Sequence, residues 1–192
     1  MQSRLQLPTF RRFGMAAGVA AILLLAGCSD SSAPRSVLTV TEINNNAPLS
    51  SDVRNFGTDR TPNTTDDFVV EDQVAVEILS EVHDPALDVF QSGPFGHIFI
   101  TNYEIRYESE EEIEPVSGSL AWTIPVNTTF VGSLAVVPVA RKAAPPLSVL
   151  VSGGEIIATA HITLRGKEKD SNAPVKIETQ LPVHFANWVD GN

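Results

Sequence analysis

Apolar and polar residues alternate along most of the chain after residue 36, with the period of two that is typical of β-strands. The clearest case is the segment 98–107, in which Tyr103, Ile105 and Tyr107 point to one side and polar residues to the other. The same alternation predicts six further strands, over residues 37–42, 74–79, 119–126, 133–140, 156–164 and 175–185. The last two read as a closing hairpin around residues 167–174. About seven strands are therefore expected.

A helical period is almost absent from the chain. Only residues 144–151 form a candidate helical turn, with prolines at its start and a Ser-Gly-Gly sequence to end it. Many strands with one helical connection predict an all-β fold, an antiparallel immunoglobulin-like β-sandwich, and a small barrel is the main alternative. We place this domain at residues 37–192, with Trp122 in its core. Pro138 and Pro182 lack an N–H donor, so bulges or edge positions are expected there.

The first 28 residues break the strand pattern. Arg4, Arg11 and Arg12 precede an apolar run over residues 15–26, and small residues then lead to Cys28, the only cysteine. This is the layout of a secretory signal. About twelve apolar residues span ~18 Å as a helix, which is short of the ~20 residues that a membrane crossing needs. We therefore expect cleavage, and an uncleaved membrane anchor is the alternative.

The sequence Leu-Ala-Gly-Cys that ends at Cys28 resembles the lipobox of bacterial lipoproteins. The resemblance implies that residues 1–27 are a signal peptide and that Cys28 is lipidated, with palmitate-like acyl chains, as the new N-terminus. Several acyl chains would hold the protein on a membrane permanently. Residues 28–36 would then form a polar tether. Because Ser29 rather than an aspartate follows the cysteine, the enterobacterial sorting rule favours the outer membrane over the inner membrane.

Cleavage would also change the charge of the chain. Removal of 27 residues from 192 leaves 165, and it removes three arginines and no acid, so the net charge falls from −10 to −13. A chain this acidic repels nucleic acid and anionic lipid head groups, and we expect neither as a partner. Lipidation of the single cysteine would leave no thiol for a disulfide, a metal site or catalysis.

Three further segments support a resemblance that covers nearly the whole mature chain. They are the Gly-Pro-Phe loop at residues 93–95, the strand IFITNYEIRY that follows it, and the closing sequence ITLRGKEKDSNAPVKIETQLPVHFANW. Together with the lipobox, these segments resemble uncharacterised single-domain bacterial surface lipoproteins with immunoglobulin-like folds. The resemblance implies a fold and a location in the cell envelope, and it carries no activity and no functional residue.

Acidic residues form the only pattern that points to a ligand. Aspartates crowd one end of the long loop over residues 44–67 and continue just past it: Asp59, Asp66, Asp67 and Asp72. Five glutamates follow the clearest strand: Glu108, Glu110, Glu111, Glu112 and Glu114. Calcium is bound by several carboxylate and carbonyl oxygens, so the aspartates are candidate calcium ligands. Neither stretch has the D-x-D-x-D-G register, and such runs are also typical of solvated turns. No other cofactor is expected.

Catalytic motifs are missing from the sequence. The four histidines lie in different segments, and there is no G-x-S-x-G elbow and no phosphate-binding glycine loop. We therefore expect a non-enzymatic structural or protein-interaction module, with an unidentified protein partner in the envelope. That hypothesis predicts an exposed strand edge or apolar patch. A glycan- or calcium-binding module is the alternative, using the loops 44–67 or 84–96, and a hydrolase of unfamiliar type is the third hypothesis.

Overall fold

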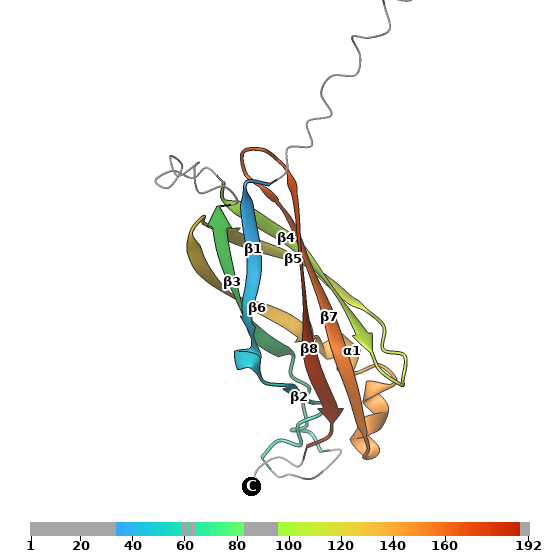
Figure 1. Ribbon diagram of the computed structural model, residues 1–192. Helices are drawn as coiled ribbons and strands as arrows, with labels where there is room; N and C mark the ends of the chain where they lie inside the picture. The colour runs from blue at the N-terminus through green and yellow to red at the C-terminus, as the bar shows by residue number, and fades with distance from the viewer. Residues whose placement is uncertain (1–33, 59–60, 62–63, 83–95, 189–192) are drawn as a thin grey trace, which may run out of the picture. The chain divides into compact units, whose positions relative to one another are not determined.

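Eight strands in the described part of the chain form two β-sheets that pack around one apolar core (Figure 1). The three-stranded sheet has the order β1-β3-β6, with bounds Ser36–Ile43, Asp72–Val82 and Thr128–Val137. The five-stranded sheet has the order β2-β8-β7-β4-β5, with bounds Leu49–Asp52, Pro174–Ala186, Glu155–Glu168, Ile98–Glu108 and Val116–Ile124. The expected all-β, sandwich-like fold is confirmed, with two separate sheets rather than one closed barrel.

This computed structural model describes residues 34–58, 61, 64–82 and 96–188. The expected signal peptide, Cys28, Asp59 and nearly all of the loop 84–96 lie outside the described residues. Within the described part of the chain, no helix combines the length and the apolar character that a membrane crossing requires.

Alternation along the strands explains how the core forms. In β3, Val74, Val76 and Ile78 are buried, and in β7 every second residue from Ile156 to Leu164 is buried. Branched aliphatic side chains suit this pleated, half-buried setting. Each buried side chain of this kind contributes roughly 1.5–3 kcal/mol, so the facing sides of the two sheets supply most of the stabilisation.

The first long loop contains a strand that the alternation does not predict. β2 (Leu49–Asp52) pairs in parallel with residues 183–186 of β8, so the sandwich is not purely antiparallel. A short 3-10 turn, η1 (Asn44–Asn46), precedes it. The sequence Leu-Ser-Ser-Asp has little strand propensity, and Ser51 is its main buried residue. This strand therefore forms because it can pair with the edge of β8, and not because its own residues alternate.

The strand expected over residues 133–140 ends early. β6 stops at Val137, and Pro138 occupies the N-cap position of the short helix α1 (Val139–Lys142), because a residue without an N–H suits a helix start. A 3-10 segment, η3 (Leu147–Ser152), follows close to the expected helical turn. Pro182 pairs with Thr159 just before the stretch of β8 that β2 joins, which is the expected edge position.

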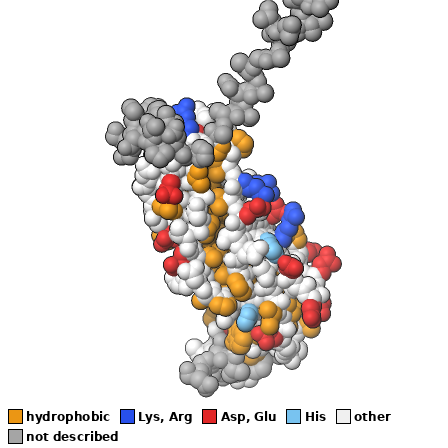
Figure 2. All heavy atoms as spheres, in the orientation of Figure 1, with side chains coloured by type: hydrophobic (Ala, Val, Ile, Leu, Met, Phe, Trp, Pro, Cys, Tyr) orange, Lys and Arg blue, Asp and Glu red, His pale blue; other side chains and the backbone are white. Residues whose placement is uncertain are grey.

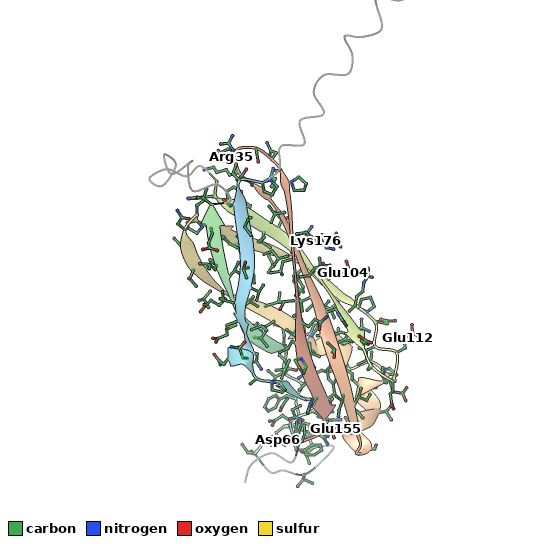
Figure 3. All side chains as sticks on the ribbon, viewed as in Figure 1. Arg35, Asp66, Glu104, Glu112, Glu155 and Lys176 are labelled. Atoms are coloured by element: carbon green, nitrogen blue, oxygen red, sulfur yellow. The ribbon has the colours of Figure 1, made fainter. Side chains whose placement is uncertain are left out.

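Two ends of the domain are defined by the long strand β7. At its last residue the carboxylate of Glu168 is fully buried and accepts the backbone N–H of Arg35 at 3.1 Å, as well as the hydroxyl of Ser171. Its first residue is Glu155, and a strand of 14 residues spans about 40 Å. Figure 3 labels Arg35 and Glu155 toward opposite ends of the domain. We call the end near Arg35 and Glu168 the tether end, and the end near Glu155 the distal end.

Candidate functional site

An open recess of about 550 Å³ lies at the distal end, between η3, the start of β7 and the turn that joins β4 to β5. It is lined by Glu110, Glu111, Pro146, Val149, Leu150, Gly154, Glu155, Ile156 and Ile157. We call it the distal recess. It combines exposed apolar side chains with part of the glutamate run.

Strand pairing brings these distant segments together. β4 is antiparallel to β7, and Glu108 at the end of β4 lies opposite Thr159. Residues that continue past Glu108 therefore run alongside the first residues of β7. This register places the glutamate turn beside Glu155 and Ile157, which are more than forty positions later in the chain.

The apolar wall of the recess follows from local geometry. In η3, Leu147 and Leu150 are three residues apart, which is one turn of a 3-10 helix, so both are buried and Val149 faces outward. In β7 the alternation buries Ile156 and exposes Ile157. Val149 is 63% exposed and Ile157 is 61% exposed. Two branched apolar side chains are therefore presented to solvent in one recess.

The acidic rim comes from the turn between β4 and β5, and side-chain contacts hold both sides of that turn. Glu108 lies 2.9 Å from Nε2 of His161, and Glu114 accepts a hydrogen bond from Arg141 at 2.6 Å. Within the described part of the chain, no ion pair neutralises the three glutamates between them, Glu110 to Glu112. Their negative charge therefore faces solvent and the recess.

Glu155 adds a further carboxylate on the other side of the recess. It lies 3.7 Å from Nδ1 of His184, which is the residue opposite Ile157 in the β7–β8 pair. No lysine or arginine is among the residues that line the recess. In Figure 2 hydrophobic, acidic and histidine side chains occur together at this end of the visible face.

Three of the four candidate calcium ligands lie in the described part of the chain, and each has a hydrogen-bond or ion-pair partner within the protein. Asp59 lies outside the described residues. Asp66 accepts the backbone N–H of Thr58 at 2.9 Å, and Asp67 forms an ion pair with Arg54 at 3.0 Å. Two of the four candidates thus already have partners within the protein.

The fourth candidate, Asp72, pairs with a buried lysine. Its Oδ1 lies 2.8 Å from Nζ of Lys142, and its Oδ2 accepts the hydroxyl of Ser51 at 2.6 Å. Nζ of Lys142 also donates to the carbonyl of Asp52 at 2.7 Å. Among the residues that the structure describes, no group of three or more His, Cys, Asp or Glu side chains is arranged to hold a metal ion. A calcium site that includes these aspartates stays a prediction.

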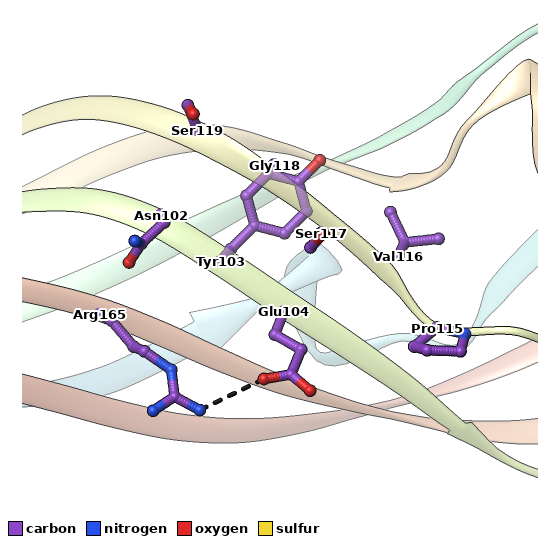
Figure 4. A pocket seen from close by; sticks show the side chains of 9 residues that line it. All are labelled: Asn102, Tyr103, Glu104, Pro115, Val116, Ser117, Gly118, Ser119 and Arg165. Carbon is purple, nitrogen blue, oxygen red and sulfur yellow. Dashed lines mark hydrogen bonds and ion pairs between the residues drawn. The ribbon is translucent and has the colours of Figure 1, made fainter.

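A second depression lies over β4 and β5 (Figure 4). The ring of Tyr103 lies against Gly118, where a Cβ atom would come within 2.5 Å of it. Burial raises the pKa of Tyr103 above its usual value of 10.0. Glu104 accepts a hydrogen bond from Arg165 at 3.2 Å, and the hydrogen bond from Arg106 lowers the pKa of Glu104. Because its charges neutralise one another and its tyrosine is packed, this groove offers less to a partner than the distal recess.

The hydrolase hypothesis would draw on the histidines, of which His97, His161 and His184 lie in the described part of the chain and are half-buried. His161 is 2.9 Å from Glu108 and 3.3 Å from Gln180, on the outer side of the five-stranded sheet. His184 faces Glu155 at the rim of the distal recess. His83 lies outside the described residues. His161 also lines two open depressions of about 380 and 560 Å³, together with Thr163 and Glu178, so the hydrolase hypothesis stays a prediction.

Comparison of the chain with models of protein families, with curated proteins and with solved structures finds no match. The functional argument consequently depends on the residues and geometry described above.

Proposed function

We propose that this chain is a lipid-anchored, non-enzymatic interaction module of the bacterial cell envelope. Its immunoglobulin-like domain is held to a membrane, preferentially the outer membrane, through Cys28, and it presents the distal recess to a partner protein. The observation that carries this proposal is the separation of the two ends. The chain enters the domain beside Glu168, whereas the exposed apolar residues lie at the other end of β7, about 40 Å away.

The order of the strands supports the immunoglobulin-like type. In the constant type of that fold the first, second, fourth and fifth strands share one sheet and the third, sixth and seventh form the other, whereas the variable type adds strands beside the third. Here β1, β3 and β6 share one sheet, and β4, β7 and β8 are adjacent in the other. β2 and β5 add one strand to each side of that second group. The inter-sheet disulfide of antibody domains cannot form because the chain has a single cysteine, and β4, which occupies the place of the strand that carries the antibody tryptophan, contains no tryptophan.

Exposed apolar surface at the distal end supports a protein partner. Monomeric proteins expose single apolar side chains routinely, but a recess that groups them and is rimmed by charge is typical of an interaction site. A flexible tether of residues 28–36 would join the domain at the end opposite this surface, so the tether itself would not cover it. The site would then be open to a soluble or membrane-bound partner.

Anchoring is tested by labelling cells with a palmitate analogue and fractionating their membranes. We expect the wild-type protein to carry the label and to sediment with outer membranes, and a Cys28→Ser variant to lose both properties. Sedimentation of the Cys28→Ser variant with membranes, or an unlabelled wild-type protein, would overturn the anchoring part of the proposal.

The interaction part is tested with a photo-crosslinking amino acid placed at Val149 in intact envelopes. The matched control carries it at Val131 of β6, which is 62% exposed compared with 63% for Val149. We expect one defined crosslinked protein species from position 149 and none of it from position 131. The same crosslinks from both positions would contradict a specific surface at the distal end.

A further inference from the structure

The charge of the distal recess indicates which charged side chains its partner carries. Three carboxylates line it, those of Glu110, Glu111 and Glu155, and none of its lining residues in the described part of the chain is a lysine or arginine. The whole chain carries a net charge of −10, so the surrounding field has the same sign. Such a surface repels acidic peptides and attracts basic ones, and the effect is strongest at low ionic strength.

The apolar residues of the recess set a second requirement for the partner, which must cover them with apolar groups of its own. Val149 and Ile157 stand exposed above the nearly buried Leu150 and Ile156, which form an apolar floor. A volume of about 550 Å³ accepts a few aliphatic side chains of a peptide. A compact inorganic cation would leave these apolar surfaces uncovered. The partner must therefore bring apolar and basic groups together.

We infer that the distal recess binds a short segment of a partner protein in which aliphatic residues are flanked by lysine or arginine. The aliphatic side chains would cover Val149 and Ile157, and the flanking cations would lie against Glu110 and Glu111. Recognition of this kind places apolar anchors at the centre and charge complementarity at the rim. The inference deepens the proposed function by naming the chemistry of the partner.

A designed peptide, Gly-Ser-Lys-Lys-Leu-Leu-Lys-Lys-Ser-Gly, tests this inference directly. Its binding to the full-length lipidated protein, held in nanodiscs of zwitterionic lipid, is measured by fluorescence anisotropy and corrected with empty nanodiscs. We expect saturable binding that weakens as salt increases. Two control peptides, with glutamates in place of the lysines or serines in place of the leucines, should bind at least about fivefold more weakly.

Variants of the protein locate the binding site. We expect Val149→Ser and the double variant Glu110→Gln/Glu111→Gln each to weaken binding by about fivefold. The matched controls are Val131→Ser and Glu81→Gln, which change exposed residues outside the recess and should leave binding unchanged. All five positions are at the surface, so circular dichroism should show that each variant keeps its fold.

Several outcomes would overturn the inference. They are equal binding of the glutamate peptide, binding that Val149→Ser leaves unchanged, or an equal effect of the control variants. Failure here would leave anchoring through Cys28 and crosslinking at Val149 intact, and the partner would then have another chemistry. Conversely, a protein that is not lipidated could still bind the peptide through this recess, so the two proposals fail separately.

Discussion

Lys142 is a buried lysine whose charge is balanced inside the protein. Its side chain is 1% exposed, and its Nζ contacts Asp72 at 2.8 Å and the carbonyl of Asp52 at 2.7 Å. The residue thereby connects α1 to β3 and to the end of β2. A buried charge that loses its partner is strongly unfavourable, so the two partners depend on each other.

Replacement of this lysine should therefore be costly. We expect Lys142→Met to lower the free energy of unfolding by about 3 kcal/mol, because Asp72 would keep its charge without a cation. Urea denaturation measures the change. The control is Lys176→Met, which removes an exposed ion pair with Glu178 and should have no measurable effect. Equal losses in both variants would contradict the structural role of Lys142.

The two tyrosines predict how stability depends on alkaline pH. Burial raises the pKa of Tyr103 and of Tyr107 above 10.0, and the Tyr107 hydroxyl donates to the carbonyl of Val136 at 2.5 Å. Because the folded protein retains these protons at a pH where the unfolded chain releases them, stability is full below pH ~10 and falls as the pH rises further. Tyr107→Phe should make that fall shallower in denaturation experiments between about pH 8 and 11. A fall of unchanged slope would contradict the assignment.

Calcium should have little effect on the described domain. Asp67 forms an ion pair with Arg54. Asp66 accepts hydrogen bonds from the backbone N–H of Thr58 and, at 2.8 Å, from the hydroxyl of Thr64. We expect about 2 mM calcium to change the thermal midpoint by less than about 1 °C, compared with EDTA, because a ligand stabilises only if it binds the folded state. A larger rise that is lost in Asp66→Asn would instead support the calcium hypothesis.

At the scale of the elements, the packing of β5 against β6 depends on a glycine, Gly132. These strands belong to different sheets, and Trp122 of β5 contacts Phe130 of β6 with ring centroids 5.4 Å apart. A Cβ atom at Gly132 would lie 2.6 Å from the indole ring. The sequence predicts Trp122 in the core. In the structure Trp122 is half-buried and packs against the core from the boundary between the two sheets.

A methyl group at this glycine should therefore disturb the boundary. We expect Gly132→Ala to lower the free energy of unfolding by about 1–3 kcal/mol and to change the tryptophan fluorescence, because two rigid rings cannot both move aside. Trp122→Leu in the same chain should recover part of the loss, which a double-mutant cycle measures. Additive losses would show that the glycine and the tryptophan do not interact.

Strands with a strong alternation could be predicted from the sequence, whereas elements defined by their partners could not. β3, β4, β7 and β8 carry regular runs of branched and aromatic residues, and each was expected within a few positions. β2 was missed because its four residues have no such run and depend on β8. α1 was missed because its residues continue the apolar pattern of β6, and only Pro138 marks the change.

The sequence shows the segments that line the distal recess, but it does not show that these segments meet. The glutamate run and the proline-started apolar segment are both visible in the sequence. Their meeting depends on the register that places Glu108 opposite Thr159, and register is a property of the folded sheet. Nothing in the spacing of residues 110 and 149 indicates that they line one recess.

At the scale of the whole molecule, acidity affects stability as well as partner choice. The chain has 23 acidic and 13 basic residues, so like charges repel one another in the folded domain. We expect the thermal midpoint to rise when sodium chloride increases from about 0.02 to 0.3 M, because salt shortens the reach of this repulsion. A lower midpoint at higher salt would indicate that attractive ion pairs dominate instead.

The parallel pair of β2 and β8 has a consequence for how the domain can be made. Residues 49–52 find their partners only at residues 183–186, close to the end of the chain. A chain that emerges from its N-terminus cannot complete the five-stranded sheet until residues 183–186 are present. Contacts this distant also make folding slow. The sequence order of its strands thus delays the completion of the five-stranded sheet until long after β2 has been synthesised.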